Sequence, residues 1–284
     1  MMENQILPKT PIGQAYYSRQ LYFYVFGVVC HNGRQATQGK NDVFFYTWLE
    51  SENHKDSNMI ASAIQHLLSH RLEVIKSKKV VRLFSDSCFG QNKNVNVLSM
   101  LMSNRKRLFP QTDILYTFPV RGHSYLPADR AFGRVSQDIR TRETISLPEE
   151  YVEIFEQHGQ VFQYGKDWQA FDFKAETKLF LKQKRTFQIS NVKRMDISGS
   201  GTKVSVSDSF NRDLCEHSLL KPGKSWANFR PSVLHPVSTV KDPKKDDVRK
   251  LLAEMGATQS VKERYEVFFN VQTAAADDAD YESD

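Results

Sequence analysis

The chain has 284 residues, of which 40% are hydrophobic and 25% are charged, a composition that is typical of a globular protein and excludes a disordered one. Its longest apolar run, residues 21–30, is about half the length of a membrane span, and no secretory signal opens the sequence, so we expect a soluble protein. The net charge of +6 becomes +11 over residues 1–270, because residues 271–284 hold five of the 33 acidic residues and none of the 39 basic ones; a basic body of this kind favours a polyanionic partner.

The first half of the chain alternates between strand and helix patterns. Runs rich in β-branched and aromatic residues predict strands, whereas apolar residues at helical spacing predict helices. The predicted strands are 21–30, 43–49, 79–85 and 113–119, and the predicted helices are 57–76, 92–108, 127–142, 148–158 and 244–256. This order predicts an α/β fold with a mixed or mostly parallel sheet flanked by helices, in which ligands bind beyond the carboxyl ends of the strands.

The composition changes after about residue 175. Short apolar runs at 187–190, 203–210 and 217–223, separated by glycine-rich turns, predict a small β-rich subdomain. Its basic residues include Lys182, Lys184, Arg185, Lys193, Arg194 and Lys203. The expected organisation is an N-terminal segment (1–20), a core (21–175), the basic β-rich subdomain (176–235), a helical segment (236–270) and an acidic disordered tail (271–284).

Polar side chains follow the strand predicted at 79–85. The stretch LFSDSCFGQNKNVN, residues 83–96, places Asp86 at the strand end and follows it with Gln91, Asn92, Lys93 and Asn94. A carboxylate at a strand end suits Mg²⁺ or Mn²⁺, which prefer oxygen ligands. Two alternatives stay open: Asp86 caps the following helix, or the asparagines close the turn.

A second polar stretch, RGHSYLPADRAFGRVSQ at 121–137, contains His123 and Asp129. Asp129 and residue 136 are seven apart, so on a helix they share a side. A glutamate at 136 would stand where a metal ligand is needed, but this chain has Ser136. The alternatives are a hydrogen-bonded loop histidine and an aspartate that stabilises the helix N-terminus through its charge.

The two stretches together resemble a family of transposon-derived invertebrate proteins that carry SDxCxGQNKN and GHSxxxxD motifs. The likeness runs from about residue 3 to 255. It implies an RNase H-like core of the DDE transposase type and a two-metal mechanism of strand cleavage and joining. In that mechanism Asp86 would be the central acid, and the amides after it would orient the loop or contact phosphate.

The chain departs from the family pattern at two of its acids. Ser136 occupies the position of the third acid, and the first acid is either truncated away or replaced. Glu3 is expected to be a poor substitute because chain ends are seldom held firmly. Asp129 is the possible substitute ligand.

We therefore expect a transposon-derived nucleic-acid-binding protein with a degenerate metal site and no cleavage activity. If the site works, Asp86 and Asp129 are its catalytic and metal-binding residues and its cofactor is Mg²⁺ or Mn²⁺. The expected partner is DNA, with RNA as the alternative and no membrane. The expected location is the nucleus, with the cytoplasm as the alternative. The expected nucleic-acid contacts are Gln91, Asn92, Lys93, Asn94, Arg121, His123, Lys184 and Arg185.

Two other functions stay open, an active metal-dependent nuclease or transposase and a protein-interaction scaffold. Oligomeric state is not predicted. Cys88 has no histidine near it in the sequence, so thiol catalysis is not expected. The aromatic residues Tyr16, Tyr17, Tyr22, Phe23 and Tyr24 are expected in the sheet core rather than in a base-stacking surface.

Overall fold

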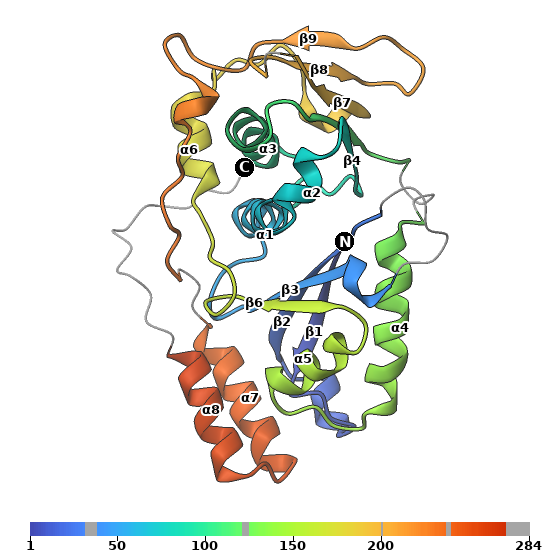
Figure 1. Ribbon diagram of the computed structural model, residues 1–284. Coiled ribbons are helices and arrows are strands. Elements are labelled where there is room, and N and C mark those ends of the chain that lie inside the picture. Colours follow the sequence, from blue (N-terminus) through green and yellow to red (C-terminus); the bar gives the residue numbers. More distant parts are fainter. Residues whose placement is uncertain (32–38, 121–124, 200, 237–239, 271–284) are drawn as a thin grey trace. The chain divides into compact units, whose positions relative to one another are not determined.

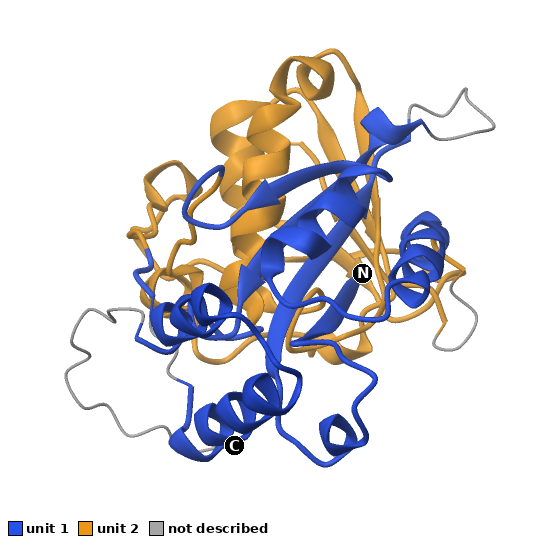
Figure 2. Cartoon of the chain, turned by 90° about the horizontal axis from the view of Figure 1, so that it is seen from below, with its two compact units in different colours: residues 1–55, 127–167, 234–284 blue, residues 56–126, 168–233 orange. Residues whose placement is uncertain are grey.

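We describe the computed structural model over residues 1–31, 39–120, 125–199, 201–236 and 240–270 (Figure 1). Contacts within the chain define two compact units, both built from separate stretches of sequence (Figure 2). Unit 1 comprises 1–55, 127–167 and 234–284, and unit 2 comprises 56–126 and 168–233. The units thus interleave segments that the sequence prediction assigned to consecutive domains.

Unit 1 contains a four-stranded mixed sheet in the order β1-β2-β3-β6. The strands are β1 (Met2–Leu7), β2 (Leu21–Val29), β3 (Val43–Leu49) and β6 (Gln160–Gln163), and short 3₁₀ helices η1 (Gly13–Tyr16) and η2 (Lys40–Asp42) precede β2 and β3. The β1–β2 and β2–β3 pairs are antiparallel, whereas β6 runs parallel to β3. All seven residues of β3 are buried, which is expected of a central strand covered on both faces.

The helices of unit 1 are α4 (Pro127–Thr141), α5 (Pro148–Glu156), α7 (Asp242–Glu254) and α8 (Gln259–Phe269). Helix α4 packs closely on β2 at Gly27, where a Cβ atom would lie 2.5 Å from Cε2 of Phe132. The ring of Phe132 also packs edge-on against Phe45, with centroids 5.5 Å apart. A residue without a side chain is therefore needed at position 27.

Unit 2 contains a five-stranded mixed sheet in the order β4-β5-β7-β8-β9. The strands β4 (Val80–Phe84) and β5 (Asp113–Thr117) are parallel, and β7 (Arg194–Ile197), β8 (Val204–Ser207) and β9 (Cys215–His217) continue the sheet in antiparallel fashion. The predicted β-rich segment thus extends the sheet that begins with β4 and β5.

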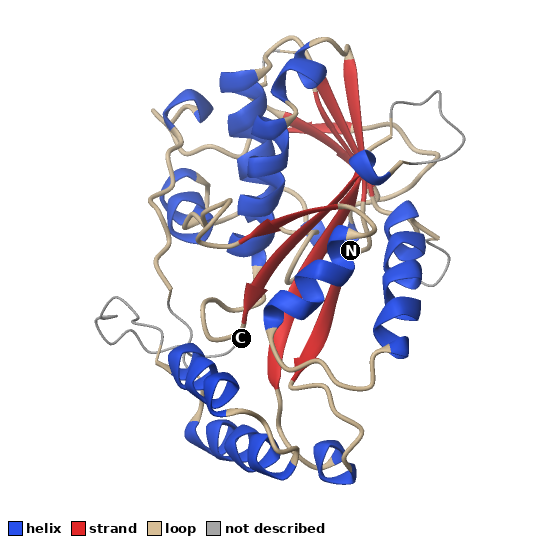
Figure 3. Ribbon diagram, turned by 60° about the horizontal axis from the view of Figure 1, so that its bottom comes forward, coloured by secondary structure: helices blue, strands red, loops and turns tan. Residues whose placement is uncertain are grey.

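The helices of unit 2 are α1 (Ser57–His70), α2 (Leu72–Lys76), α3 (Val95–Leu108) and α6 (Phe173–Phe180), with 3₁₀ turns η3 (Ile189–Asn191) and η4 (Trp226–Asn228). Helix α3 packs against α1, α6 and η4, and helices lie alongside strands within each unit (Figure 3). Among the described residues, no helix is long and apolar enough to cross a membrane.

A buried arginine connects three elements of unit 2. Arg105 of α3 is only 2% exposed, and its Nη2 lies 2.8 Å from Oδ1 of Asp113 at the start of β5. Its Nε donates to the Thr112 carbonyl at 3.0 Å, and Nη1 and Nη2 donate to the Gly199 carbonyl at 3.2 Å in the turn between β7 and β8. Because a buried cation needs such partners, these bonds position the turn.

The α/β class with mixed sheets and flanking helices is confirmed. The predicted strands correspond to β2–β5, but the predicted helix 57–76 is interrupted at Arg71 and the strand predicted at 187–190 is wrong, because Ile189–Asn191 forms a 3₁₀ turn. Strands β1 and β6 and helices α6 and α8 were not predicted. The predicted disordered tail, 271–284, lies outside the described residues.

Candidate nucleic-acid-binding groove

The loop between β4 and α3 is closed by its own hydrogen bonds. The carbonyl of Cys88 accepts from the backbone N–H groups of Gln91, Asn92 and Lys93 at 3.3, 2.9 and 3.0 Å. Asp86 is exposed at the end of β4, and the side-chain amide of Asn92 donates to its Oδ1 at 2.5 Å. The buried side chain of Asn92 thus fixes the position of the Asp86 carboxylate.

Asn94, rather than Asp86, caps helix α3. Its side-chain oxygen accepts from the backbone N–H groups of Asn96 and Val97, both at 3.0 Å. Its amide nitrogen donates back to the carbonyls of Phe89 and Gln91. The helix-cap alternative for Asp86 is therefore wrong, because Asn94 already fills that role.

Asp86 lies where two parallel strands end side by side. Phe84 of β4 is in register with Thr117 of β5, and the Ser85 hydroxyl lies 2.7 Å from the hydroxyl of Tyr116. Burial raises the pKa of Tyr116, and the nearby Asp86 charge raises it further against the opposing hydrogen bond with Ser85. Tyr116 therefore stays protonated and acts as a hydrogen-bonding group at this sheet end.

Lys93 joins the loop to a distant segment. Its side chain is 2% exposed, and its Nζ donates to the carbonyl of Ser190 at 2.7 Å. The same ammonium lies 5.0 Å from the ring centroid of Phe118 and 5.7 Å from that of Phe89. A lysine held in this way positions the 183–190 segment beside the loop, a structural role that the sequence did not indicate.

The loop and this segment line one open cavity of about 560 Å³, which we call the motif groove. Phe89 is 43% exposed, and Lys184 and Arg185 are exposed opposite it. Four of the predicted contact residues, Lys93, Asn94, Lys184 and Arg185, therefore line one groove within unit 2. Its lining residues are Phe89, Lys93, Asn94, Val95, Gln183, Lys184, Arg185, Phe187, Gln188, Ile189 and Ser190.

The net positive charge of residues 1–270 comes from unit 2. Counted over the sequence, unit 2 holds 22 of the 39 lysines and arginines and 10 of the 33 acidic residues, a net charge of +12. Unit 1 up to residue 270 holds the other 17 basic residues and 18 acidic ones, a net charge of −1. The motif groove thus lies in the unit that would attract a polyanion.

The other predicted metal residues lie in unit 1. Asp129 and Ser136 both lie on α4, two turns apart on one side of the helix. Glu3 is held in β1 opposite Val25, so the expectation of a poorly held chain end is wrong. Burial raises the pKa of the Glu3 carboxyl, and the charge of Asp129 contributes in the same direction.

These acids do not form a metal cluster in the part of the chain that is described. No group of three or more His, Cys, Asp or Glu side chains is arranged to hold an ion there. Asp86 belongs to unit 2 and Asp129 to unit 1, so a metal site shared by the two stays a prediction.

Two predicted contact residues, Arg121 and His123, lie outside the described residues. The expectation that the tyrosines near β2 are core residues is wrong for three of them, because Tyr22 is 37% exposed and two others are more so. Tyr16 and Tyr17 are 87% and 81% exposed, in and after the short turn η1, whereas Phe23 of β2 is buried as expected. A run of aromatic residues does not by itself indicate where the strand begins.

Comparison with known proteins places this geometry in a family. Residues 14–203 match the family described as domain of unknown function (DUF7869). The chain belongs to the DUF7869 family. No curated protein and no solved structure matches it. All residues that line the motif groove fall inside the part shared with DUF7869, whereas β1 with Glu3 falls outside it.

Proposed function

We propose that this DUF7869 protein is a transposon-derived nucleic-acid-binding protein that contacts its ligand through the motif groove and does not cut it. The loop between β4 and α3, which we call the motif loop, lines one groove together with the basic 183–190 segment. This groove lies in a unit with a net charge of +12, and that observation carries the proposal. The resemblance to DDE transposases supplies the polynucleotide as ligand class and a nuclear location.

The groove combines the two kinds of group that bind a single strand. Lys184 and Arg185 supply exposed cations for backbone phosphates, and phosphate contacts dominate affinity. Phe89 and the half-buried Phe187 supply aromatic faces on which bases stack in a manner tolerant of sequence. We therefore expect single-stranded DNA to bind more tightly than a duplex of the same sequence, with single-stranded RNA as the alternative ligand.

The residues present do not fit the two-metal centre that the resemblance implies. Ser136 supplies no carboxylate at its position on α4, and Oδ1 of Asp86 already accepts a hydrogen bond from Asn92. Two divalent ions need several carboxylate ligands in one place. We therefore assign Asp86 a part in holding the loop rather than in cleavage.

Fluorescence anisotropy with a labelled 20-nucleotide single strand tests the proposal. We expect Lys184→Gln/Arg185→Gln to weaken binding at least about 10-fold and to lower the salt slope by about 1 to 2, since two phosphate contacts are lost. The matched control is Lys78→Gln/Lys79→Gln, which removes two exposed cations of unit 2 outside the groove. Equal weakening by the control, or no binding by the parent protein at 50 mM salt, would overturn the proposal and favour the protein-interaction scaffold.

An active metal-dependent nuclease is the second candidate, and the position of Glu3 favours it. Glu3 is held in β1, and the charge of Asp129 contributes to raising the pKa of its carboxyl group. Glu3 is therefore a better substitute acid than the sequence suggested. Calorimetry with Mg²⁺ and Mn²⁺ separates the candidates. Our proposal expects that neither the parent protein nor Asp86→Ala binds two ions. Two-ion binding that Asp86→Ala abolishes would establish the active enzyme. If only Ser136→Glu gains metal binding, the metal site was lost through the residue at position 136.

A further inference from the structure

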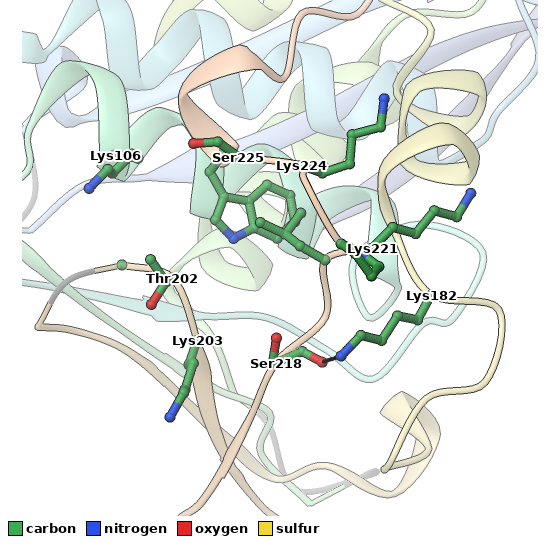
Figure 4. Close-up of a pocket in the computed structure, with 12 residues that line it drawn as sticks. Lys106, Lys182, Thr202, Lys203, Ser218, Lys221, Lys224 and Ser225 are labelled. Atoms are coloured by element: carbon green, nitrogen blue, oxygen red, sulfur yellow. Dashed lines mark hydrogen bonds between the residues drawn. The ribbon is translucent and has the colours of Figure 1, made fainter.

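A second cavity of unit 2, of about 410 Å³, is formed by residues that the motif groove does not use. We call it the lysine cavity (Figure 4). Its walls come from the C-terminal part of α3, Lys182 just after α6, residues 201–203 before β8, the segment after β9, and η4. It is lined by Lys106, Lys182, Gly201, Thr202, Lys203, Ser218, Leu220, Lys221, Pro222, Lys224, Ser225 and Trp226.

Five of these twelve residues are lysines and none is acidic. The carboxylate that meets one of them is Glu216, 2.5 Å from Nζ of Lys203. Lys182 and Lys221 donate to the backbone carbonyls of Ser218 and Lys178. Clustered cations in a partly enclosed space repel one another until an anion binds.

The Lys182 ammonium points to Ser218 at the cavity, whereas those of Lys203 and Lys224 point outward (Figure 4). Lys224 lies over the ring of Phe180, 4.7 Å from its centroid. These contacts to carbonyls and a ring are weak, and the flexible stems of exposed lysines let the outward groups turn toward a bound anion.

Trp226 provides a second, independent observation at this cavity. Its side chain is 1% exposed, and its Nε1 has no hydrogen-bond partner among the described residues. Indole N–H is a donor only, so a buried one without an acceptor costs free energy. Hydroxyl groups of Thr202, Ser218 and Ser225 add further donors to the same lining.

One wall of the cavity is built rigidly. Gly201 has a φ of +66°, and a Cβ atom there would lie 2.8 Å from Nη1 of Arg105. The guanidinium of Arg105 also binds the Gly199 carbonyl, so the turn that carries Thr202 and Lys203 is fixed to α3. A preformed wall lowers the ordering cost of binding.

We propose that the lysine cavity binds linked phosphates, the di- or triphosphate group of a small molecule. The cavity volume lies in the range of small-molecule sites, about 300–1,000 Å³. Several lysines around one cavity match a chain of phosphates better than a single phosphate. The site is separate from the proposed nucleic-acid groove, because the two linings share no residue.

Calorimetry at 150 mM salt with inorganic tripolyphosphate as the probe tests this proposal. We expect the parent protein to bind one tripolyphosphate, and Lys182→Gln/Lys221→Gln to bind it at least about 10-fold more weakly because two phosphate contacts are removed. Lys78→Gln/Lys79→Gln and the groove variant Lys184→Gln/Arg185→Gln are expected to bind as the parent does. Orthophosphate is expected to bind at least about 10-fold more weakly than tripolyphosphate.

Trp226→Phe tests the indole contact alone, since it keeps an aromatic ring and removes the N–H. We expect about a fivefold to 10-fold loss of tripolyphosphate affinity, with the fold checked by circular dichroism. A nucleoside triphosphate arm identifies the source: equal affinity means that the phosphate chain is the whole ligand, and tighter binding means that a nucleoside is recognised too. Equal weakening by the Lys78/Lys79 control, more than one probe bound per chain, or equal affinity for orthophosphate would overturn the proposal.

Discussion

The two units differ in what they bury. The large apolar cluster of unit 1 joins strands β1–β3 to α4, α5, α7 and α8 through aliphatic and aromatic side chains. Of the sixteen polar or charged residues that are buried in the described chain, thirteen belong to unit 2, including Lys93 and Arg105. Both units have a buried apolar core, but unit 2 also contains most of the buried polar groups, among them two cations held by hydrogen bonds.

This difference bears on function. Apolar packing tolerates many substitutions of similar volume, whereas a buried cation needs its partners in place. In unit 2 the two buried cations position segments that line cavities: Lys93 holds the 183–190 segment at the motif groove, and Arg105 holds the β7–β8 turn at the lysine cavity. The two buried cations of unit 2 therefore hold in place the segments that carry exposed basic residues.

The largest expected effect comes from removing the buried cation of unit 2. Arg105→Met should lower the free energy of unfolding by about 3 kcal/mol, because two backbone carbonyls and the partly exposed Asp113 lose their buried partner. Urea denaturation followed by circular dichroism measures it. The control is Arg107→Met, an exposed neighbour on α3 that should cost less than about 1 kcal/mol; equal losses would remove the proposed difference between the units.

The corresponding change in unit 1 alters apolar packing alone. Gly27→Ala should cost about 1–3 kcal/mol, because the new methyl group would overlap the ring of Phe132. Combining it with Phe132→Leu should cost less than the sum of the two single changes, since the smaller side chain leaves room. Additive losses in a double-mutant cycle would show that this contact does not limit packing.

A buried carboxyl group of unit 1 should make stability depend on pH. Burial raises the pKa of Glu52 to about 7, although the Leu49 N–H donates to its Oε2 at 2.7 Å. The folded state therefore favours the protonated acid, and the cost of ionising it grows as the pH rises from the unfolded pKa near 4.5 toward 7. The titratable neighbour is Tyr164, whose own pKa is raised by burial and by the Glu52 charge.

Glu52→Gln removes this cost. The variant should be more stable than the parent protein by about 2 kcal/mol at pH 8 and no more stable at pH 4. Urea midpoints measured across this range give the difference directly. A constant difference at all pH values would mean that the pKa of the carboxyl group is the same in the folded and unfolded states.

The smallest expected effects concern two residues of the motif loop, Asp86 and Asn94. Asn94→Ala should cost about 1 kcal/mol through loss of the α3 cap, whereas Asp86→Ala should cost about 0.5 kcal/mol because its carboxylate is exposed. Thermal melting of both variants in the same buffer compares them. A larger loss for Asp86→Ala would mean that the bond between Asn92 and Asp86 stabilises unit 2 more than the α3 cap does.

Much of the fold could be predicted because its central elements have regular patterns. Strands β2–β5 consist of apolar and β-branched runs, and α1, α3 and α4 repeat apolar residues at helical spacing. Strand β1, with the sequence MENQIL, has no such pattern and depends on pairing with β2. Helix α8 lies within the predicted helical segment 236–270, but its apolar face of Val261, Tyr265 and Phe268 was not recognised as a separate helix.

The site was predictable in its parts and not in its assembly. The motif loop and the Lys184–Arg185 cluster could each be recognised from composition, but 88 residues separate Asn96 from Lys184 along the chain. They meet because Lys93 binds Ser190, a tertiary contact that leaves no local trace in the sequence. The lysine cavity was missed for the same reason, since its five lysines come from four separate stretches.

The order in which the chain visits the two units restricts how the gene could be divided. The polypeptide passes between units four times, after residues 55, 126, 167 and 233, and both of its ends belong to unit 1. An expression fragment cut to the 14–203 region shared with DUF7869 would lose β1 from one sheet and β8 and β9 from the other. Because each unit is made of separate stretches of sequence, no single continuous piece of the gene encodes one unit alone.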